Sequence, residues 1–286
     1  MRFTPLALAI TAASGALAVP SRPSGRGFNC GAPEPHAEHI RISQKFAAEE
    51  AERAAAGDFS IQAATTVDTY FHIVASSTAL SDGYVTDAML TAQLEAMNNA
   101  YAPHNIQFAH KGTTRTINAN WAADGNGYEM TMKRALRKGT YRTLNLYFLK
   151  DMGDNLGYCY FPESAKAGST TYIRDGCTIL YSTVPGGSAT NYNLGHTVTH
   201  EVGHWFGLYH TFQGGCTGSG DSVSDTPAQA SASSGCPVGR DSCPSQAGLD
   251  PIHNYMDYSY DSCYEEFTAG QQTRMMSFFN TYRANN

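Results

Sequence analysis

One eleven-residue stretch, HEVGHWFGLYH from His200 to His210, constrains this chain more than any other feature. Residues four apart on a helix lie one turn apart on the same face, so His200 and His204 can present two imidazoles to one metal ion. Glu201 follows the first imidazole, within reach of a water on that metal. Gly207 tolerates a positive φ, which would end the helix and bring His210 round as a third ligand.

Three protein ligands leave one of zinc's four positions open for water, as in catalytic rather than structural sites. We therefore predict one catalytic Zn²⁺ held by His200, His204 and His210. The alternative is a helix whose surface histidines bind no metal. His196 lies on the same face of that helix, but a fourth histidine would close the open position, so we leave it out.

The long motif resembles that of the metzincin zinc peptidases, which also carry a methionine turn downstream of the histidines. The sequence NYMDY at 254–258 fits that turn. The resemblance implies that Met256 forms a hydrophobic floor under the three histidines and that Tyr258 helps to stabilise the transition-state oxyanion. An ordinary core methionine and a tyrosine that only packs are the alternatives.

Within that clan the chain is similar to the pappalysin family, through GDSVSDTP at 220–227, the NYMDY turn and the cysteines around them. The resemblance covers roughly residues 65–286. It implies an α+β metzincin-type catalytic domain. A twisted, mostly parallel sheet and the active-site helix would form the upper sub-domain, and an irregular, disulfide-braced stretch the lower one.

The resulting hypothesis is a secreted zinc-dependent metalloendopeptidase that hydrolyses peptide bonds of proteins through a zinc-bound water. Glu201 would take the water proton and return it to the leaving amine, and Tyr258 would donate a hydrogen bond to the oxyanion. A zinc peptidase with a carboxylate third ligand is one alternative, but His210 already fills that role. A catalytically silent, secreted zinc-binding interaction protein is the other, and a general base at Glu201 argues against it.

Residues 1–18 read as a secretory signal peptide, with Arg2 at the start, an apolar core and small residues at 16 and 18. A buried N-terminal helix is the alternative. The charged fraction of 15% and the net charge of −6 argue against nucleic-acid binding. No further apolar run is long enough to span a membrane. We expect an extracellular monomer that acts on protein or peptide substrates.

Seven cysteines leave one unpaired if the chain is oxidised. Six lie in the body, and sequence alone allows 15 pairings of six cysteines. The pappalysin resemblance suggests the pairs Cys216–Cys243 and Cys236–Cys263, which leaves Cys159 with Cys177.

Cys30 is the cysteine left over, and it lies in a segment, 19–60, that reads as a propeptide ending somewhere between 55 and 65. The peptidase domain would then span 61–286. The resemblance implies that Cys30 can occupy the open zinc position and keep the precursor latent. A stray thiol or an intermolecular disulfide is the alternative.

Periodicity and end signals predict helices at 36–56, 86–101, 128–138, 194–206 and 268–282, and strands at 67–74, 106–109, 143–149 and 177–181. We expect the last of these strands near the substrate cleft. Asp221 and Asp225 are hard oxygen donors in a Gly/Ser-rich loop and candidate ligands of a structural Ca²⁺, unless they only form turns. Asp257 and Asp261 give slight support for a pocket that takes a basic substrate side chain.

Overall fold

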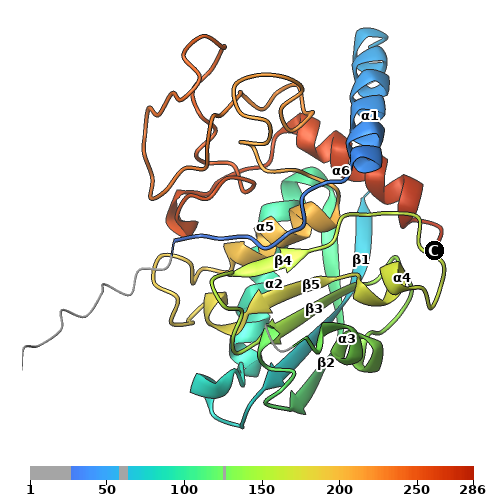
Figure 1. Cartoon of the computed structure of the whole chain (residues 1–286), viewed down its shortest axis with the longest axis vertical. Helices are drawn as coiled ribbons and strands as arrows, with labels where there is room; N and C mark the ends of the chain where they lie inside the picture. The colour runs from blue at the N-terminus through green and yellow to red at the C-terminus, as the bar shows by residue number, and fades with distance from the viewer. Residues whose placement is uncertain (1–26, 58–63, 125–126) are drawn as a thin grey trace, which may run out of the picture.

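The computed structural model describes residues 27–57, 64–124 and 127–286 (Figure 1). The predicted signal peptide at 1–18 lies outside the described residues, and so do residues 58–63 of the predicted maturation interval. The helices are α1 (Ala37–Ala55), α2 (Asp87–Tyr101), α3 (Glu129–Leu136), α4 (Thr170–Arg174), α5 (His196–Trp205) and α6 (Ala269–Tyr282). The strands are β1 (Thr65–Ala75), β2 (Ile106–Ile117), β3 (Leu144–Leu149), β4 (Gly157–Cys159) and β5 (Cys177–Leu180).

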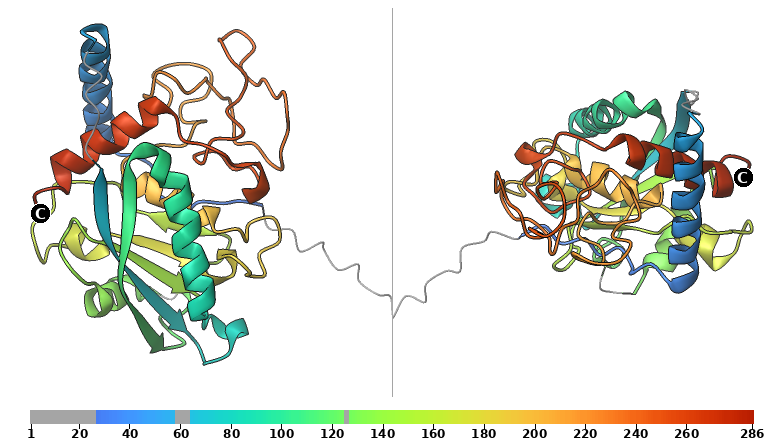
Figure 2. Two further views of the ribbon diagram at one scale, coloured as in Figure 1. Left: turned by 180° about the vertical axis from the view of Figure 1, so that it is seen from behind. Right: turned by 90° about the horizontal axis from the view of Figure 1, so that it is seen from above.

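The five strands form one sheet in the order β2-β1-β3-β5-β4. Every neighbouring pair is parallel except β4 and β5, which run antiparallel. All six residues of the central strand β3 are buried, as expected for a parallel strand covered on both faces. Leu146 and Phe148 belong to a core shared with α2 and α5, whereas Tyr147 and Leu149 belong to a second core with Met132 of α3. Figure 2 shows α2 lying along one face of the sheet.

The upper sub-domain is therefore the mostly parallel sheet with its helices, as predicted. β2 extends to Ile117, well beyond the predicted end at 109. α5 begins at His196 rather than 194, because Gly195 has φ +94°, which a helix cannot continue. The predicted strand at 177–181 is β5, but β4 lies beyond it as the edge strand. β4 was not predicted, since three residues carry too little periodicity.

The chain between α5 and α6 is largely irregular, with a 3₁₀ turn at Asp261–Cys263 and a single bridge between Asn254 and Glu266. The loops lie together above the sheet (Figure 1). Disulfides join Cys216 to Cys243 and Cys236 to Cys263 within this region, and Cys159 to Cys177 across β4 and β5. The suggested pairing is thus confirmed, and Cys30 is the free cysteine of the described residues.

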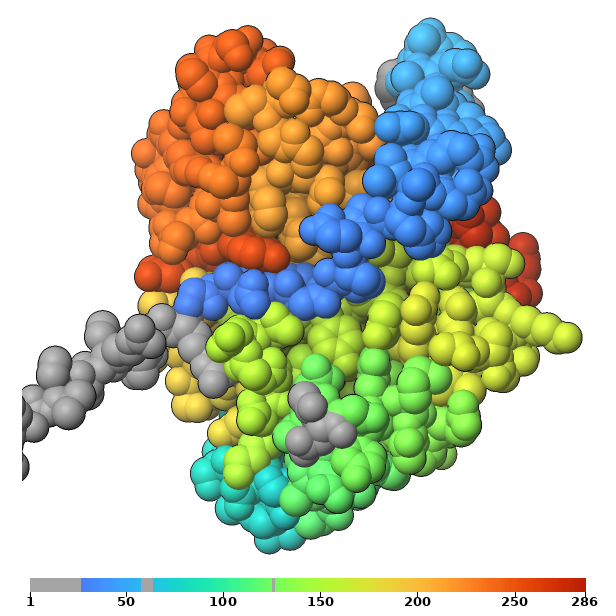
Figure 3. Space-filling view, in the orientation of Figure 1, coloured from blue at the N-terminus to red at the C-terminus, as the bar shows by residue number. Residues whose placement is uncertain are grey.

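The N-terminal segment crosses the front of the molecule and then turns into α1, which packs on α6 (Figures 1 and 3). The buried guanidinium of Arg274 in α6 donates to the Glu50 carboxylate at 2.9 Å and to the Ser43 hydroxyl at 2.8 Å. His39 is buried, and its ring stacks on Phe278. These contacts tie the N-terminal helix to the C-terminal one.

None of the helices within the described ranges has both the length and the apolar character needed to cross a bilayer.

Candidate metal centre and active site

Three histidines converge at the end of α5. His200 and His204 are fully buried one turn apart on the helix, and His210 follows from the loop beyond it. The Nε2 atom of His204 lies 3.2 Å from Nε2 of His200 and 3.1 Å from Nε2 of His210. The sequence spacing predicted this convergence, and the structure places all three ring nitrogens around one point.

The hydrogen bonds of two rings fix which nitrogens face that point. His200 Nδ1 lies 2.7 Å from the Tyr255 carbonyl oxygen, and His204 Nδ1 lies 2.8 Å from the Leu208 carbonyl oxygen. Because a carbonyl accepts a hydrogen bond, Nδ1 carries the proton in each ring and Nε2 presents a lone pair. Burial also lowers the pKa of His204 to about 4 and that of His200 well below its usual value, so both stay neutral. Converging lone pairs on neutral imidazoles fit a bound cation.

Two glycines allow this geometry. Gly207 has φ +97°, and a Cβ there would lie 2.4 Å from Cδ2 of Phe278, so glycine serves both the turn and the packing. Gly203 lies directly over Met256, because a Cβ at 203 would come within 2.4 Å of the methionine sulfur. Met256 is fully buried. The methionine therefore lies against the helix of the first two histidines, and no sequence motif pointed to its close contact with Gly203.

The Met256 turn is also joined to the third histidine. The Thr211 backbone N–H, one residue after His210, donates to the Met256 carbonyl at 3.2 Å. Asn254 exchanges side-chain hydrogen bonds of 2.8 and 2.9 Å with Gln271 of α6. The turn and the histidine loop are thus held to one another and to the last helix.

Glu201 is fully buried beside the histidines, next to the edge strand β4. A Cβ at Gly157 would lie 2.8 Å from Cγ of Glu201, so a glycine is required where the strand passes the carboxylate. Burial raises the pKa of Glu201 to about 8. Oε1 has no hydrogen-bond partner among the described residues, and Oε2 accepts from the Cys30 thiol at 3.4 Å. A carboxyl buried beside the histidines in this way is a candidate for proton transfer.

Cys30 comes to the same point from the N-terminal segment. One ligand atom each from Cys30, His200, His204 and His210 lies within 4.8 Å of all the others, a set of one sulfur and three nitrogens suited to tetrahedral zinc. Without a cation, burial and the Glu201 carboxylate raise the pKa of the thiol well above its usual value. A cation at this point would reverse that balance and favour the thiolate.

Tyr258 lies beside His210 and the N-terminal segment. Its hydroxyl oxygen is 3.3 Å from Nε2 of His210 and accepts a hydrogen bond of 3.3 Å from the Cys30 backbone N–H. Burial raises its pKa far above 10, so the hydroxyl keeps its proton. It is therefore a neutral hydrogen-bonding group that touches both the third histidine and the backbone of the segment in the cleft.

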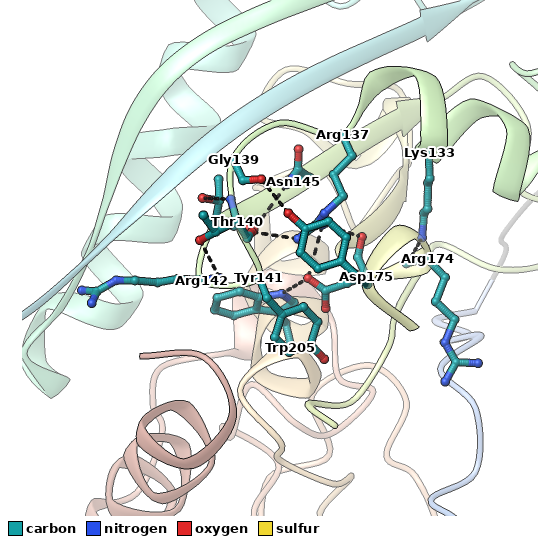
Figure 4. Close-up of polar contacts among 12 residues, drawn as sticks. Lys133, Arg137, Gly139, Thr140, Tyr141, Arg142, Asn145, Arg174, Asp175 and Trp205 are labelled. Carbon is teal, nitrogen blue, oxygen red and sulfur yellow. Dashed lines mark hydrogen bonds and ion pairs between the residues drawn. The ribbon is translucent and has the colours of Figure 1, made fainter. Parts of the chain in front are cut away.

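A buried ionic network anchors the far end of α5 (Figure 4). The Asp175 carboxylate accepts from the indole N–H of Trp205, the residue after His204, at 3.3 Å. It also accepts from Arg283 at 2.9 Å and from Arg137 at 3.4 Å. The helix that carries two of the histidines is thereby fixed to both the sheet region and the C-terminus. No motif in the sequence pointed to Asp175.

The two candidate calcium ligands make hydrogen bonds typical of turns and caps. Asp221 accepts from the Thr226 hydroxyl, and Asp225 accepts from the hydroxyl of Thr268, the N-cap residue of α6. Neither belongs to a cluster with metal-ligand spacing among the described residues. Calcium at this place stays a prediction without support from these contacts.

Asp257 and Asp261 are buried and hold the chain around them. Asp257 accepts from the Gln229 amide at 3.0 Å, while Asp261 accepts from the backbone N–H groups of Leu194 and His196. His196 itself lies outside the histidine cluster. The two carboxylates therefore support loops at the start of α5 and near the methionine turn.

A family model described as Peptidase_M43, pregnancy-associated plasma protein-A, matches residues 137–280. An extracellular metalloprotease of Podospora anserina is 67% identical, with 100% of this chain and 99% of the relative covered. One from Neurospora crassa is 68% identical over 90% of each chain. This chain belongs to the pappalysin family.

Solved structures agree with that assignment. Mature mirolysin of Tannerella forsythia, solved with a cleaved peptide, is 29% identical, with a TM-score of 0.64 over 77% of this chain and 93% of its own. A promirolysin mutant from the same organism is 27% identical, with a TM-score of 0.67 over 89% of this chain and 94% of its own. This pappalysin is an α+β metzincin and a metal-dependent endopeptidase of proteins.

Proposed function

We propose that this pappalysin is a secreted zinc endopeptidase in which His200, His204 and His210 hold the metal. The observation that carries the proposal is the meeting of three imidazole nitrogens, two of them on fully buried rings, with a buried carboxyl beside them. Zinc bound there would act as a Lewis acid on the scissile carbonyl and lower the pKa of water. Relatives named extracellular metalloproteases and the signal-like residues 1–18 support secretion.

Glu201 is the general base and acid of this proposal. Its carboxylate takes a proton from the attacking water and gives it to the leaving amine. The Tyr258 hydroxyl, which already contacts a backbone amide in the cleft, donates to the oxygen that gains charge during attack. The buried surroundings strengthen both interactions, because little water competes for them.

We further propose that residues 19–60 form a propeptide and that Cys30 keeps the precursor latent as a fourth metal ligand. The free thiol lies with the three histidines, and the backbone on both sides of it is hydrogen-bonded to the edge of the sheet. A chain held in this way excludes both water and substrate from the metal.

Zinc content and casein hydrolysis of the purified full chain, before and after removal of the N-terminal segment, test the proposal. We expect about one zinc per chain, activity after removal, and loss of activity with phenanthroline. Glu201→Gln should keep zinc and lose turnover by about 10²-fold or more. His200→Gln should lose both, while His110→Gln, an exposed histidine of β2, should lose neither.

Latency has its own test. Full-length Cys30→Ala should cleave a small peptide without removal of the segment, whereas Asn29→Ala should stay as inactive as wild type. A Cys30→Ala precursor as inactive as wild type would overturn the thiol latch. A zinc-loaded mature protein that cleaves nothing would favour a silent zinc-binding protein instead.

A further inference from the structure

The inner face of α1 carries four side chains in a single row. The row consists of His39, Ser43, Phe46 and Glu50. Because these positions follow one another at intervals of three or four residues, their side chains project from one side of the helix. Three of the four are buried, and the Glu50 side chain is only 14% exposed. Away from this row α1 is charged and exposed, as in the ion pair between Lys45 and Glu49. The helix therefore has one contact face.

The peptidase domain receives that row on a surface built mainly by α6 (Figures 1 and 3). We define the α1-binding surface as Phe161, Tyr209, Arg274, Ser277 and Phe278. The His39 ring centroid lies 4.9 Å from that of Phe161 and 4.8 Å from that of Phe278. The Phe46 ring meets Phe278 edge-on at 5.0 Å. One half of the surface is therefore aromatic and takes the first two turns of the contact face.

The other half of the surface binds a carboxylate. The peptidase domain itself holds the Arg274 guanidinium through the Ser222 carbonyl, which accepts from it at 2.6 Å. Three more hydrogen bonds run from the same guanidinium to α1, two to the Glu50 carboxylate at 3.2 and 2.9 Å and one to the Ser43 hydroxyl at 2.8 Å. The Ser277 hydroxyl donates to the same carboxylate at 2.8 Å. Arg274 and Ser277, one turn apart on α6, therefore form a site for a carboxylate that α1 supplies.

We propose that the α1-binding surface stays a helix-binding site in the mature enzyme, and that its partner is the removed N-terminal segment, which binds back as a separate chain. Without α1, Arg274 loses its carboxylate and the ring of Phe278 loses its cover, so the surface stays complementary to the same helix. This inference rests on the proposed propeptide and adds to it a second attachment. Phe46 and Glu50 contact α6 rather than the metal-binding histidines, so this attachment does not need zinc.

The segment would then bind at two places joined by a few residues. Its strand half pairs with the edge strand β4, where the Gly31 N–H donates to the Gly157 carbonyl at 2.8 Å. Its helix half begins at Ala37 and binds the α1-binding surface. When one half is bound, the short connection holds the other at a high effective concentration. The two halves together should therefore bind far more tightly than either half alone.

Synthetic peptides of the segment test the two-part binding. Enzyme matured from the folded full chain is assayed on a small peptide substrate, with peptides 27–57 and 27–35 as inhibitors. The longer peptide should inhibit at least about tenfold more strongly. Glu50→Gln in the longer peptide should weaken inhibition about tenfold or more, because the buried Arg274 loses its charged partner. Glu49→Gln, which changes the exposed carboxylate next to it, is the matched control and should weaken inhibition less than about threefold.

A change on the enzyme side locates the contact. Ser277→Ala removes the second donor to the Glu50 carboxylate. It should weaken binding of the 27–57 peptide about threefold or more and leave binding of its Glu50→Gln form nearly unchanged, because the two groups act on each other. Circular dichroism of the peptides checks that Glu49→Gln and Glu50→Gln have equal helicity. Equal inhibition by peptides 27–57 and 27–35, or equal effects of Glu49→Gln and Glu50→Gln, would overturn the proposal.

Failure of the helix site can be told apart from failure of the proposed function. If the mature protein cleaves no peptide, the proposed function fails. Fluorescence anisotropy of a labelled 36–57 peptide, which lacks Cys30 and the strand half, then decides the helix site by itself. The peptide should bind mature protein with the same Kd, within about threefold, before and after removal of the metal with phenanthroline. No binding of this peptide, or binding that is lost with the metal, would refute the helix site even in an active enzyme.

Discussion

Replacing Gly207 by alanine should damage the metal centre through two separate costs. The residue has φ +97°, a conformation that costs a non-glycine residue roughly 1–2 kcal/mol. The new Cβ would also lie 2.4 Å from Cδ2 and 2.5 Å from Cγ of Phe278, which is fully buried and has little room to yield. Such overpacking typically costs about 1–3 kcal/mol. We therefore expect Gly207→Ala to lower the free energy of unfolding by about 2–5 kcal/mol.

The turn at Gly207 also orients a histidine. The Gly207 N–H donates to the His204 carbonyl, and the Leu208 carbonyl accepts from the His204 ring. A displaced turn would rotate that imidazole, so the affinity for zinc should fall together with stability. Urea unfolding followed by tryptophan fluorescence, with and without saturating zinc, measures both effects in the same protein.

Two controls separate the costs. Gly218 has φ +84°, and a Cβ there would meet no neighbouring atom within 4 Å. Gly218→Ala should therefore lower the free energy of unfolding only by the cost of the backbone conformation, about 1–2 kcal/mol. In a Phe278→Ala background the clash is absent, and adding Gly207→Ala should cost about the same 1–2 kcal/mol. If Gly207→Ala is no more destabilising than Gly218→Ala, the argument from close packing against Phe278 is wrong.

Three further predictions concern charge, pH and metal. Asp175→Asn should destabilise the fold by about 3–5 kcal/mol because it leaves buried arginines without their carboxylate. Asp82→Asn, which removes a solvent-screened ion pair with Lys150, should destabilise the fold far less. Thermal or urea unfolding compares the two variants. Burial holds the pKa of His39 at about 4 against an ordinary 6.5, with His36 and Arg274 adding positive charge nearby. When α1 is undocked, His39 has its ordinary pKa and is protonated at a higher pH than in the docked state. Docking of α1 should therefore weaken as pH falls from 6.5 to 4, by up to about 3 kcal/mol. Amide exchange in α1, corrected for its intrinsic pH dependence, measures this, and His39→Phe should abolish the change. Removing the metal with a chelator should lower the urea midpoint of unfolding. Adding zinc at about 100 times its Kd should raise the free energy of unfolding by about 2.7 kcal/mol.

Much of the upper sub-domain was predictable because its signals are local. Thr86 caps α2 by accepting from the Met89 N–H, and Thr268 begins α6 with a capping box. The apolar periods of β1, β3 and α2 likewise fixed the element types. The three-residue strand β4 and the extension of β2 escaped prediction, since pairing with a neighbouring strand defines them, and a single sequence does not reveal pairing.

By itself the sequence determined how three histidines and Glu201 are grouped at the end of one helix, because a fixed helical period and one permissive glycine place residues 200–210 relative to each other. It also determined, through family resemblance, which cysteines pair. The tertiary structure decided what meets that helix from elsewhere in the chain. Met256 lies under Gly203, Asp175 holds Trp205, and Phe28 fills a pocket between three rings. Those contacts join residues tens to more than a hundred positions apart, where packing and burial, rather than any backbone period, select the partners.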